Sequence, residues 1–192
     1  PQSPYAASKA ASDHVAKSYF YSYNLPIITI RPFNNFGPRQ SSRAVIPTII
    51  FQGLKGNEIK LGNVNTKRDF LFVDDTVKGI IAAINSNKNL FGEDINLGTN
   101  HSFKIKEIFN LISMLMNKKL IIKLNKEKLR PKKSEVEILK CDYSKAEKTL
   151  KWKPLYKGNV GMKKALSKTL HWYEKNYSNH LLNFKTKNVL FK

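Results

Sequence analysis

Short β-branched runs that alternate with helical segments predict an α/β fold built on a parallel sheet. Residues 27–30 are Ile-Ile-Thr-Ile, a continuous apolar run that is typical of a parallel strand buried on both faces. A helical segment precedes this run and a polar loop follows it. A helix that feeds a buried strand is half of an α/β unit, so the 192 residues are expected to form one domain, or one domain and part of another.

The first helix is predicted over residues 4–23. Ser3 suits the N-cap, and Pro4 suits the first helical position, where its missing N–H is not needed. Asn24-Leu25-Pro26 should end the helix before the strand begins. The polar segment 33–39 is then predicted as a loop at the carboxyl end of the strand, which is the edge where open α/β sheets bind ligands.

The later elements are predicted from the same alternation of periodic and continuous apolar patterns. In chain order, we expect a helix at 44–55, a strand at 59–61, a strand at 70–73 followed by a helix through 84, a strand at 95–97, a helix at 105–116, a strand at 121–122, helices at 144–150 and 160–177, and a basic tail from Ser178.

The composition argues against several protein classes. No apolar run approaches the roughly 18 residues that span a bilayer, and no basic and apolar leader is present, so neither membrane insertion nor secretion is expected. Cys141 is the only cysteine, which rules out an intrachain disulfide and favours a cytoplasmic protein. The four histidines are isolated from one another, so no metal site is expected.

The net charge of +20 raises the alternative of a basic nucleic-acid-binding module. Residues 101–192 carry 23 basic and 7 acidic side chains, whereas residues 1–100 carry 11 and 7. All but five of the basic residues are lysines, and they are not interleaved with aromatics that could stack on bases. This distribution favours a solvated lysine-rich surface without a nucleic-acid partner.

Tyr5 and Lys9 form the most informative pair of side chains. Residues i and i+4 share a helix face, so the ammonium group can lie beside the phenol. A neighbouring cation favours the phenolate and brings the pKa of tyrosine, ordinarily about 10, toward the range useful for acid-base catalysis. A chain with eight tyrosines and many lysines should also contain about one such pair by chance.

Other polar side chains have both structural and functional interpretations. Asp74 and Asp75 precede an apolar helical pattern, and we interpret them as N-cap residues rather than as catalytic carboxylates. The Arg68-Asp69 step is either a surface ion pair or the source of a guanidinium that binds phosphate. Arginine is rare in this lysine-dominated chain, which suggests a geometric need for Arg39, Arg43, Arg68 and Arg130.

Together these motifs resemble the NAD-dependent epimerase/dehydratase family of extended short-chain dehydrogenases/reductases, and most closely the bacterial nucleotide-sugar 4,6-dehydratases. The resemblance covers residues 1 to about 175, in the order and spacing typical of the family. The motifs that carry it are Tyr5-Ala6-Ala7-Ser8-Lys9, Arg31-Pro32-Phe33-Asn34-Asn35-Phe36-Gly37-Pro38-Arg39, Val45-Ile46-Pro47, Arg68-Asp69-Phe70-Leu71-Phe72-Val73-Asp74-Asp75, Asn96-Leu97-Gly98 and Leu129-Arg130-Pro131.

The resemblance implies a fold and a division of the chain. Residues 1–178 would be the C-terminal part of a Rossmann-like, doubly wound NAD-binding domain with a small α/β subdomain. The substrate-binding elements would lie mainly at 38–68 and 118–178, and residues 179–192 would be a basic tail. The implied partner is a UDP- or GDP-linked sugar, the implied setting is polysaccharide biosynthesis in the cytoplasm, and the implied assembly of the full-length protein is a homodimer.

The resemblance also assigns roles to particular residues. Tyr5 would be the catalytic acid/base at the sugar 4-hydroxyl while NAD accepts the C4 hydride, and Lys9 would lower the pKa of Tyr5 and bind the nicotinamide ribose. The remaining implied contacts are Pro32 and Phe33 beside the nicotinamide, Asn34 at the substrate diphosphate, Ala44 and Val45 in the base pocket, and Arg68 and Arg130 clamping the diphosphate.

One departure from the family is that the chain contains no Gly-x-Gly-x-x-Gly or Gly-x-x-Gly-x-x-Gly turn for the cofactor pyrophosphate. The 192 residues are therefore interpreted as a fragment without the N-terminal cofactor-binding half, and they are expected to bind NAD poorly and to be inactive alone. The expected reaction of the full-length protein is 4,6-dehydration, with loss of water and internal return of the hydride. The main alternative is a nucleotide-sugar 4-epimerase.

Overall fold

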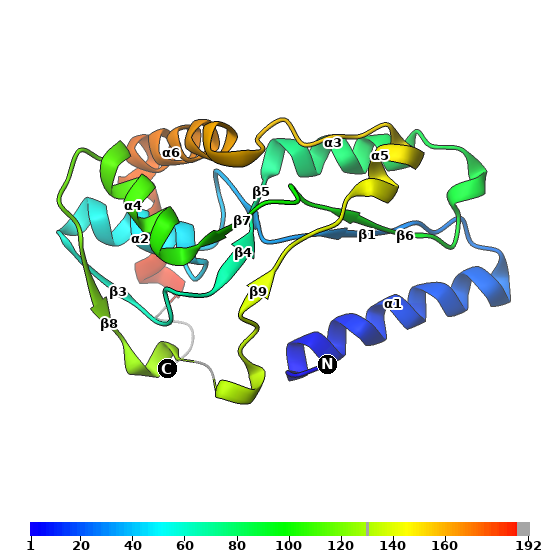
Figure 1. Cartoon of the computed structure of the whole chain (residues 1–192), viewed down its shortest axis with the longest axis horizontal. Helices are drawn as coiled ribbons and strands as arrows, with labels where there is room; N and C mark the ends of the chain where they lie inside the picture. Colours follow the sequence, from blue (N-terminus) through cyan, green and yellow to red (C-terminus); the bar gives the residue numbers. More distant parts are fainter. Residues whose placement is uncertain (130, 188–192) are drawn as a thin grey trace.

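The computed structural model describes residues 1–129 and 131–187, and its helices and strands alternate along the chain (Figure 1). The helices are α1 (Pro4–Tyr23), α2 (Val45–Lys55), α3 (Val73–Ile84), α4 (Ile105–Leu115), α5 (Ser144–Leu150) and α6 (Gly158–Lys187), with short 3-10 turns at Lys88–Leu90, Lys126–Lys128 and Lys132–Ser134. The strands are β1 (Thr29–Pro32), β2 (Asn35–Phe36), β3 (Glu58–Leu61), β4 (Lys67–Asp69), β5 (Leu71–Phe72), β6 (Asp94–Leu97), β7 (Ser102–Lys104), β8 (Ile121–Leu124) and β9 (Ile138–Leu139).

Parallel pairing dominates the sheets. The pairs β1–β6, β2–β5, β3–β8 and β4–β9 are parallel, and β4–β7 is the one antiparallel pair among the described residues. Figure 1 shows β1 and β6 between α3 and α5 on one side and α1 on the other, whereas β3 and β8 lie with α2 and α4 at the opposite end of the molecule. The predicted α/β fold with a parallel sheet is confirmed.

The core consists of two clusters of buried side chains. The larger joins α2, α4, α6 and β3, and includes Ile49, Ile59, Ile108 and Leu166. The smaller lies between α3, α5 and β6 and centres on Ile95. α1 contributes no buried residue to either cluster. Among the described residues, no helix is both long and apolar enough to cross a membrane.

Most predicted elements lie within a few residues of the observed ones. The first helix spans the predicted residues, and Ser3 Oγ caps it by accepting a hydrogen bond from the N–H of Ala6 at 3.1 Å. Asn24 ends it in the left-handed conformation, with φ of 50°. The last helix continues past Ser178, where a basic tail was expected to begin, and ends at Lys187.

Two strand predictions were wrong in detail. The strand expected at 27–30 is shifted to 29–32, and its residues are half-buried or exposed rather than buried on both faces, because β1 pairs only with β6 among the described residues. The run at 70–73 is divided between β5 and the first turn of α3. Phe70 is buried between β4 and β5 but belongs to neither strand.

Asp69 joins three segments of the chain through hydrogen bonds to its carboxylate. The side chain is fully buried and accepts from Thr99 N–H at 3.0 Å, from Thr99 Oγ1 at 2.7 Å and from Cys141 N–H at 3.1 Å. Burial, together with the charges of Asp69 and Asp142, raises the pKa of the Cys141 thiol to about 12. Of the two alternatives for the Arg68-Asp69 step, the surface ion pair therefore does not apply to Asp69, whose carboxylate fixes β4 against the segments that follow β6 and β9.

Asp75 has a similar role at α3, and its predicted N-cap position was wrong. Phe72 occupies the N-cap, and Asp74 and Asp75 lie in the first helical turn. The buried Asp75 carboxylate accepts from the backbone N–H groups of Leu155 and Tyr156 at 3.0 and 2.9 Å. It therefore fixes the loop between α5 and α6 on α3, and the structural interpretation of the residue holds.

Replacing Asp69 with Ala should lower the free energy of unfolding by about 2–5 kcal/mol, because two buried backbone N–H groups lose their acceptor. Asp74→Ala is the matched control: Asp74 is half exposed and pairs only loosely with Lys168, so its loss should cost under about 1 kcal/mol. Urea unfolding of both variants measures the difference. Equal stabilities of the two variants would contradict the structural role of Asp69.

Candidate functional site

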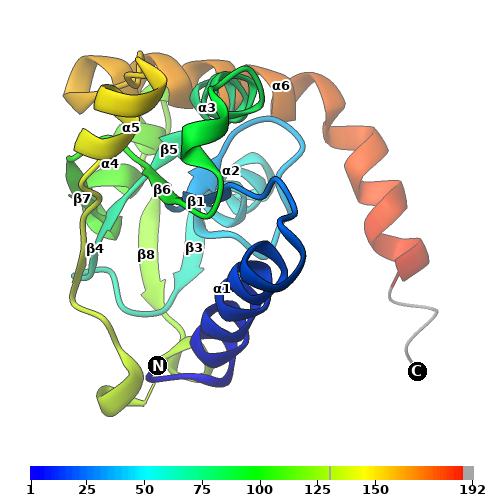
Figure 2. The ribbon, with the colours of Figure 1, turned by 90° about the vertical axis from the view of Figure 1, so that its right-hand side faces the viewer.

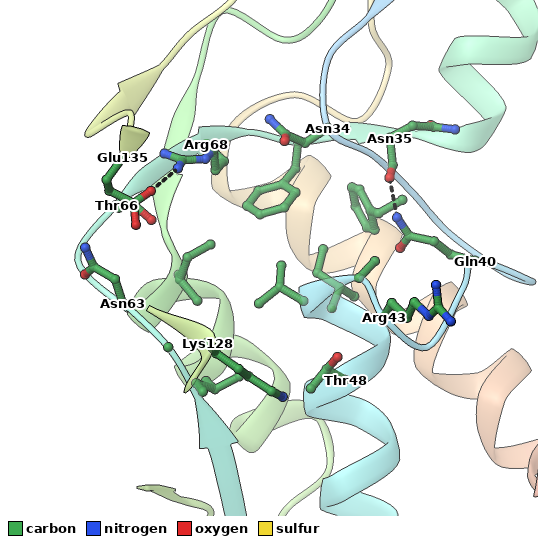
Figure 3. A pocket seen from close by; sticks show the side chains of 18 residues that line it. Asn34, Asn35, Gln40, Arg43, Thr48, Asn63, Thr66, Arg68, Lys128 and Glu135 are labelled. Carbon is green, nitrogen blue, oxygen red and sulfur yellow. Dashed lines mark hydrogen bonds and ion pairs between the residues drawn. The ribbon is translucent and has the colours of Figure 1, made fainter. Parts of the chain in front are cut away.

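A cavity of about 600 Å³ lies between the loop after β2, the start of α2 and the segment before β9 (Figure 3). Its polar lining residues are Asn34, Asn35, Gln40, Arg43, Thr48, Asn63, Thr66, Arg68, Lys128 and Glu135, and its other lining residues are Phe36, Ala44, Val45, Ile46, Leu61, Gly62, Phe70 and Ile105. A volume of this size holds a small organic ligand, and the mixture of apolar walls with a few polar groups is typical of such sites.

The loop between β2 and α2 forms one wall of the cavity. Gly37 has φ of 151°, and a Cβ atom there would lie 2.6 Å from Val73 Cγ1, so the close approach of the loop to α3 requires glycine. The Gln40 side chain donates to Asn35 O at 2.6 Å, and its backbone carbonyl accepts from Tyr173 Oη, also at 2.6 Å. These contacts fix the loop that carries Arg43 and Ala44 into the cavity lining.

Arg68 supplies the most enclosed cation of the cavity. Its side chain is 15% exposed, and its guanidinium group donates to Lys67 O at 2.8 Å and pairs with Glu135 Oε1 at 3.1 Å. Figure 3 shows Arg68 and Glu135 on one side of the cavity and Gln40 and Arg43 on the opposite side. With Lys128 the described lining contains three cations and one carboxylate, so it favours an anionic ligand.

Asn34 is positioned by the same strand that carries Arg68. Its Nδ2 donates to the backbone carbonyl of Asp69 at 3.0 Å. Asn34 lines the cavity, and its side-chain carbonyl oxygen can accept a further hydrogen bond. Asn34, between β1 and β2, and Arg68, on β4, therefore supply an amide and a guanidinium to the cavity lining.

Tyr5 and Lys9 lie outside the cavity lining, at the exposed beginning of α1. The Lys9 ammonium is 5.8 Å from the centroid of the Tyr5 ring, as expected for residues one helical turn apart. Tyr5 is 71% exposed. Both views place the start of α1 on the side of the molecule where the segment between β8 and β9 lies (Figures 1 and 2).

Ion pairs attach α1 to the sheet. Asp94, at the start of β6, pairs with Lys17 at 2.7 Å and with Arg31 at 2.9 Å, and Arg31 also pairs with Asp13 at 2.8 Å. Burial alone would raise the pKa of Asp94, but the hydrogen bonds and charges of Lys17 and Arg31 outweigh it and hold this pKa below its usual value. The hydrogen bond and charge of Asp94 raise the pKa of Lys17.

The structure gathers some of the predicted site residues and separates others. Four of them, Asn34, Ala44, Val45 and Arg68, line one cavity although they come from distant parts of the sequence. The predicted cofactor contacts, at Tyr5, Lys9, Pro32 and Phe33, lie elsewhere, on α1 and at the end of β1. Arg130 lies outside the described residues. The individual roles assigned to these residues remain predictions.

Sequence reasoning missed several residues of the cavity. Glu135, Lys128, Gln40 and Thr48 all line it, and although all four lie in the predicted substrate-binding segments 38–68 and 118–178, none was named as a site residue. No local signal marked Glu135, because its partner Arg68 lies 67 residues away in the sequence. Lys128 gave none, since lysine is the default cation of this chain.

Comparison with known proteins identifies a family and several relatives. The family model described as GDP-mannose 4,6 dehydratase matches residues 1–165. The dTDP-glucose 4,6-dehydratase of Xanthomonas campestris pv. campestris is 30% identical over 184 residues, which cover 90% of this chain and 50% of the relative. The UDP-glucuronate 4-epimerase of Thermodesulfobacterium geofontis is 32% identical over 178 residues, covering 92% and 52%.

The solved structures that this chain resembles also include nucleotide-sugar dehydratases and epimerases. The crystal structure of dTDP-glucose 4,6-dehydratase from Bacillus anthracis in complex with NAD has a TM-score of 0.81 and 30% identity, covering 93% of this chain and 54% of that one. The chain thus spans about half the length of the relatives it matches, and these relatives include both dehydratases and epimerases.

The attachment of α1 should depend on pH. The folded-state pKa of Asp94 is depressed, so its contribution is present above the ordinary value of 3.8 and is lost as the pH falls through the folded pKa. The folded-state pKa of Lys17 is raised, so its contribution is present below 10.5 and is lost as the pH rises through the folded pKa. We expect α1 to be held most firmly between these limits and loosened outside them, more at acid than at alkaline pH because the Arg31–Asp13 pair persists at alkaline pH, and NMR chemical shifts of α1 recorded against pH would detect the change.

At neutral pH, Asp94→Asn should reproduce the acid effect and accelerate amide hydrogen exchange in α1 several-fold. The matched control is Glu93→Gln, because Glu93 pairs with Lys145 on α5 and not with α1. Equal exchange rates in the two variants would show that the ion pairs do not hold the helix.

Proposed function

The chain belongs to the GDP-mannose 4,6 dehydratase family of NAD-dependent epimerases and dehydratases, and on that premise we propose that its cavity binds the nucleotide diphosphate of a nucleotide sugar. The observation that carries the proposal is the convergence of Asn34, Ala44, Val45 and Arg68 on one cavity of about 600 Å³. Their segments are far apart in the sequence, and a diphosphate, a base and a sugar together need polar and apolar walls of this kind.

The diphosphate is proposed to bind at Arg68, whose planar guanidinium can make two parallel hydrogen bonds to phosphate oxygens. Asn34, which lines the same cavity, is proposed to supply a neutral amide to the diphosphate. Glu135 already pairs with Arg68 at 3.1 Å, so an incoming diphosphate must compete with it or displace it. The carboxylate is then free to accept hydrogen bonds from ribose hydroxyls.

The base is proposed to lie against the start of α2. Ala44 and Val45 are half-buried there, and their small apolar side chains leave room for a planar ring. Arg43 and Thr48 border the same wall and offer polar contacts at its edge. Arg130 is proposed as a second diphosphate ligand on the strength of the sequence motif alone.

Tyr5 is proposed as the acid/base that moves the proton of the sugar hydroxyl, with Lys9 beside it as the cation that favours the phenolate. NAD, the cofactor of the family, would accept a hydride from the sugar and return it. The residues present fit this cofactor in part: Tyr5, Lys9 and Pro32 are exposed on the side of α1 and β1, but the chain has no glycine-rich turn for the pyrophosphate.

The reaction of the full-length protein is proposed to be 4,6-dehydration, with 4-epimerisation as the alternative. Relatives of both kinds match this chain at similar identity, and both reactions begin with the same proton and hydride removal. The setting proposed for the reaction is the cytoplasmic biosynthesis of polysaccharide sugars by a homodimer without a nucleic-acid partner.

The cavity assignment predicts that dTDP or UDP binds to the chain and that Arg68→Gln weakens the binding about 10- to 100-fold, the range expected for charge-assisted hydrogen bonds. Arg39→Gln is the matched control, because Arg39 is exposed and lies outside the cavity lining. Titration calorimetry measures both variants. Similar losses in the two variants would mean that the nucleotide binds through general surface charge.

The reaction itself is tested with the full-length gene product, NAD and a panel of UDP-, dTDP- and GDP-linked sugars. A 4,6-dehydratase yields a 4-keto-6-deoxy sugar, whose carbonyl and new methyl group are visible by NMR. A product that differs from its substrate only in the configuration at C4 would instead establish the epimerase. Tyr5→Phe should abolish either conversion while leaving nucleotide binding unchanged.

A further inference from the structure

One corner of the cavity contains a nearly buried threonine. Thr66, Arg68 and Phe70 all line the cavity, as expected of residues spaced two apart on and beside the strand β4, whose side chains point to one face. Thr66 is 6% exposed, and within the described part of the chain its hydroxyl makes no hydrogen bond. A buried hydroxyl without a partner costs stability, so this group is suited to a ligand that hydrogen-bonds with it.

Glu135 borders the same corner. Its carboxylate is 16% exposed and has one partner among the described residues, the guanidinium of Arg68 at 3.1 Å. Figure 3 shows Thr66 and Asn63 on the same side of the cavity as this ion pair. Asn63 Oδ1 accepts from the N–H of Asn65 at 3.0 Å, which leaves the amide nitrogen of Asn63 as a donor. The corner therefore offers a hydroxyl, a carboxylate and an amide beside one guanidinium.

A diphosphate that binds to Arg68 deprives Glu135 of this partner. A mostly buried carboxylate then needs new hydrogen-bond donors, because its desolvation is otherwise uncompensated. The adjacent 2′- and 3′-hydroxyls of a ribose supply two such donors, and Thr66 can bond to either of them as well. A 2′-deoxyribose supplies only the 3′-hydroxyl. The exchange of partners at Glu135 therefore favours a ribose.

The pentose is the part of the ligand that meets this corner. It joins the diphosphate, assigned above to Arg68, to the base, assigned to the wall formed by Ala44 and Val45 in the same cavity. The sugar on the other side of the diphosphate must instead reach Tyr5, which is exposed and lies outside the cavity lining. Thr66 and Glu135 are therefore placed to contact the pentose and not the sugar that reacts.

We propose that Thr66 and Glu135 select ribonucleotides, so that the substrate is linked to a ribonucleoside diphosphate such as UDP or GDP and not to dTDP. The relatives that match this chain include a dTDP-glucose 4,6-dehydratase and a UDP-glucuronate 4-epimerase, and these two nucleotides differ at the 2′-carbon of the pentose. The inference rests on the proposed function, because it requires a nucleoside diphosphate at Arg68.

The test compares UDP with dUDP, which have the same base and phosphates and differ only in the 2′-hydroxyl. Titration calorimetry should show that UDP binds about ten-fold more tightly, as expected for one hydrogen bond to a charged group. Equal affinities of the two nucleotides would overturn the selection of ribose and leave the nucleotide site itself intact. Failure of both to bind would instead overturn the proposed function, and this inference with it.

Glu135→Gln tests the carboxylate. It removes the charged acceptor of the ribose and also the anion that competes for Arg68, so UDP should bind more weakly while inorganic pyrophosphate binds more tightly. The preference for UDP over dUDP should fall several-fold. Glu137→Gln is the matched control, because Glu137 is exposed and lies outside the cavity lining, and it should keep the full preference. An unchanged preference in Glu135→Gln would overturn the proposal.

Thr66→Val tests the hydroxyl, because valine has a similar size and only the polar group is lost. The hydroxyl is unpaired within the described part of the chain, so urea unfolding should show no loss of stability. We expect the affinity for UDP to fall several-fold and the affinity for dUDP to stay unchanged. An equal loss for both nucleotides would mean that Thr66 only shapes the cavity, and it would overturn its role in selecting the ribose.

Discussion

The buried carboxylate of Asp69 is the interaction on which the arrangement of the cavity depends. It holds β4 against Thr99 and Cys141, which belong to segments 30 and 72 residues further along the chain. Arg68, the neighbour of Asp69, lines the cavity. The backbone carbonyl of Asp69 accepts a hydrogen bond from the Asn34 side chain and so orients it. A charge buried without such partners would be costly, so the carboxylate and the backbone groups that bind it specify one strand arrangement and with it the position of the guanidinium.

The two ends of the molecule differ in how completely they are packed. The end that contains the cavity has the larger core, formed by three helices and a strand pair. The other end has a small core, an open strand edge and a helix, α1, that is attached by ion pairs and buries no residue. The cavity is therefore formed at the well-packed end, whereas Tyr5 lies exposed on the loosely attached helix α1.

Local patterns predicted most of the elements because short-range signals determine them. Ser3 and Pro4 define the start of α1, and apolar periodicity defines α2 and α4. The failures concern long-range contacts. Asp75 binds a loop about 80 residues away, so its role could not be recognised from its position before a helix. For the same reason, the pairing of Arg68 with Glu135 was invisible in the sequence, although the rarity of arginine drew attention to Arg68 and Arg43, which line the cavity, as well as to Arg39, which does not.

We propose that this chain alone contains a formed pocket for a nucleotide diphosphate. The most direct test of this central proposal is an NMR titration of the isotope-labelled chain with dTDP and UDP, which maps the bound nucleotide on the structure. The account predicts shift changes concentrated at Asn34, Ala44, Val45 and Glu135, with α5 unaffected. Changes spread over the lysine-rich surface, or none at millimolar nucleotide, would contradict it.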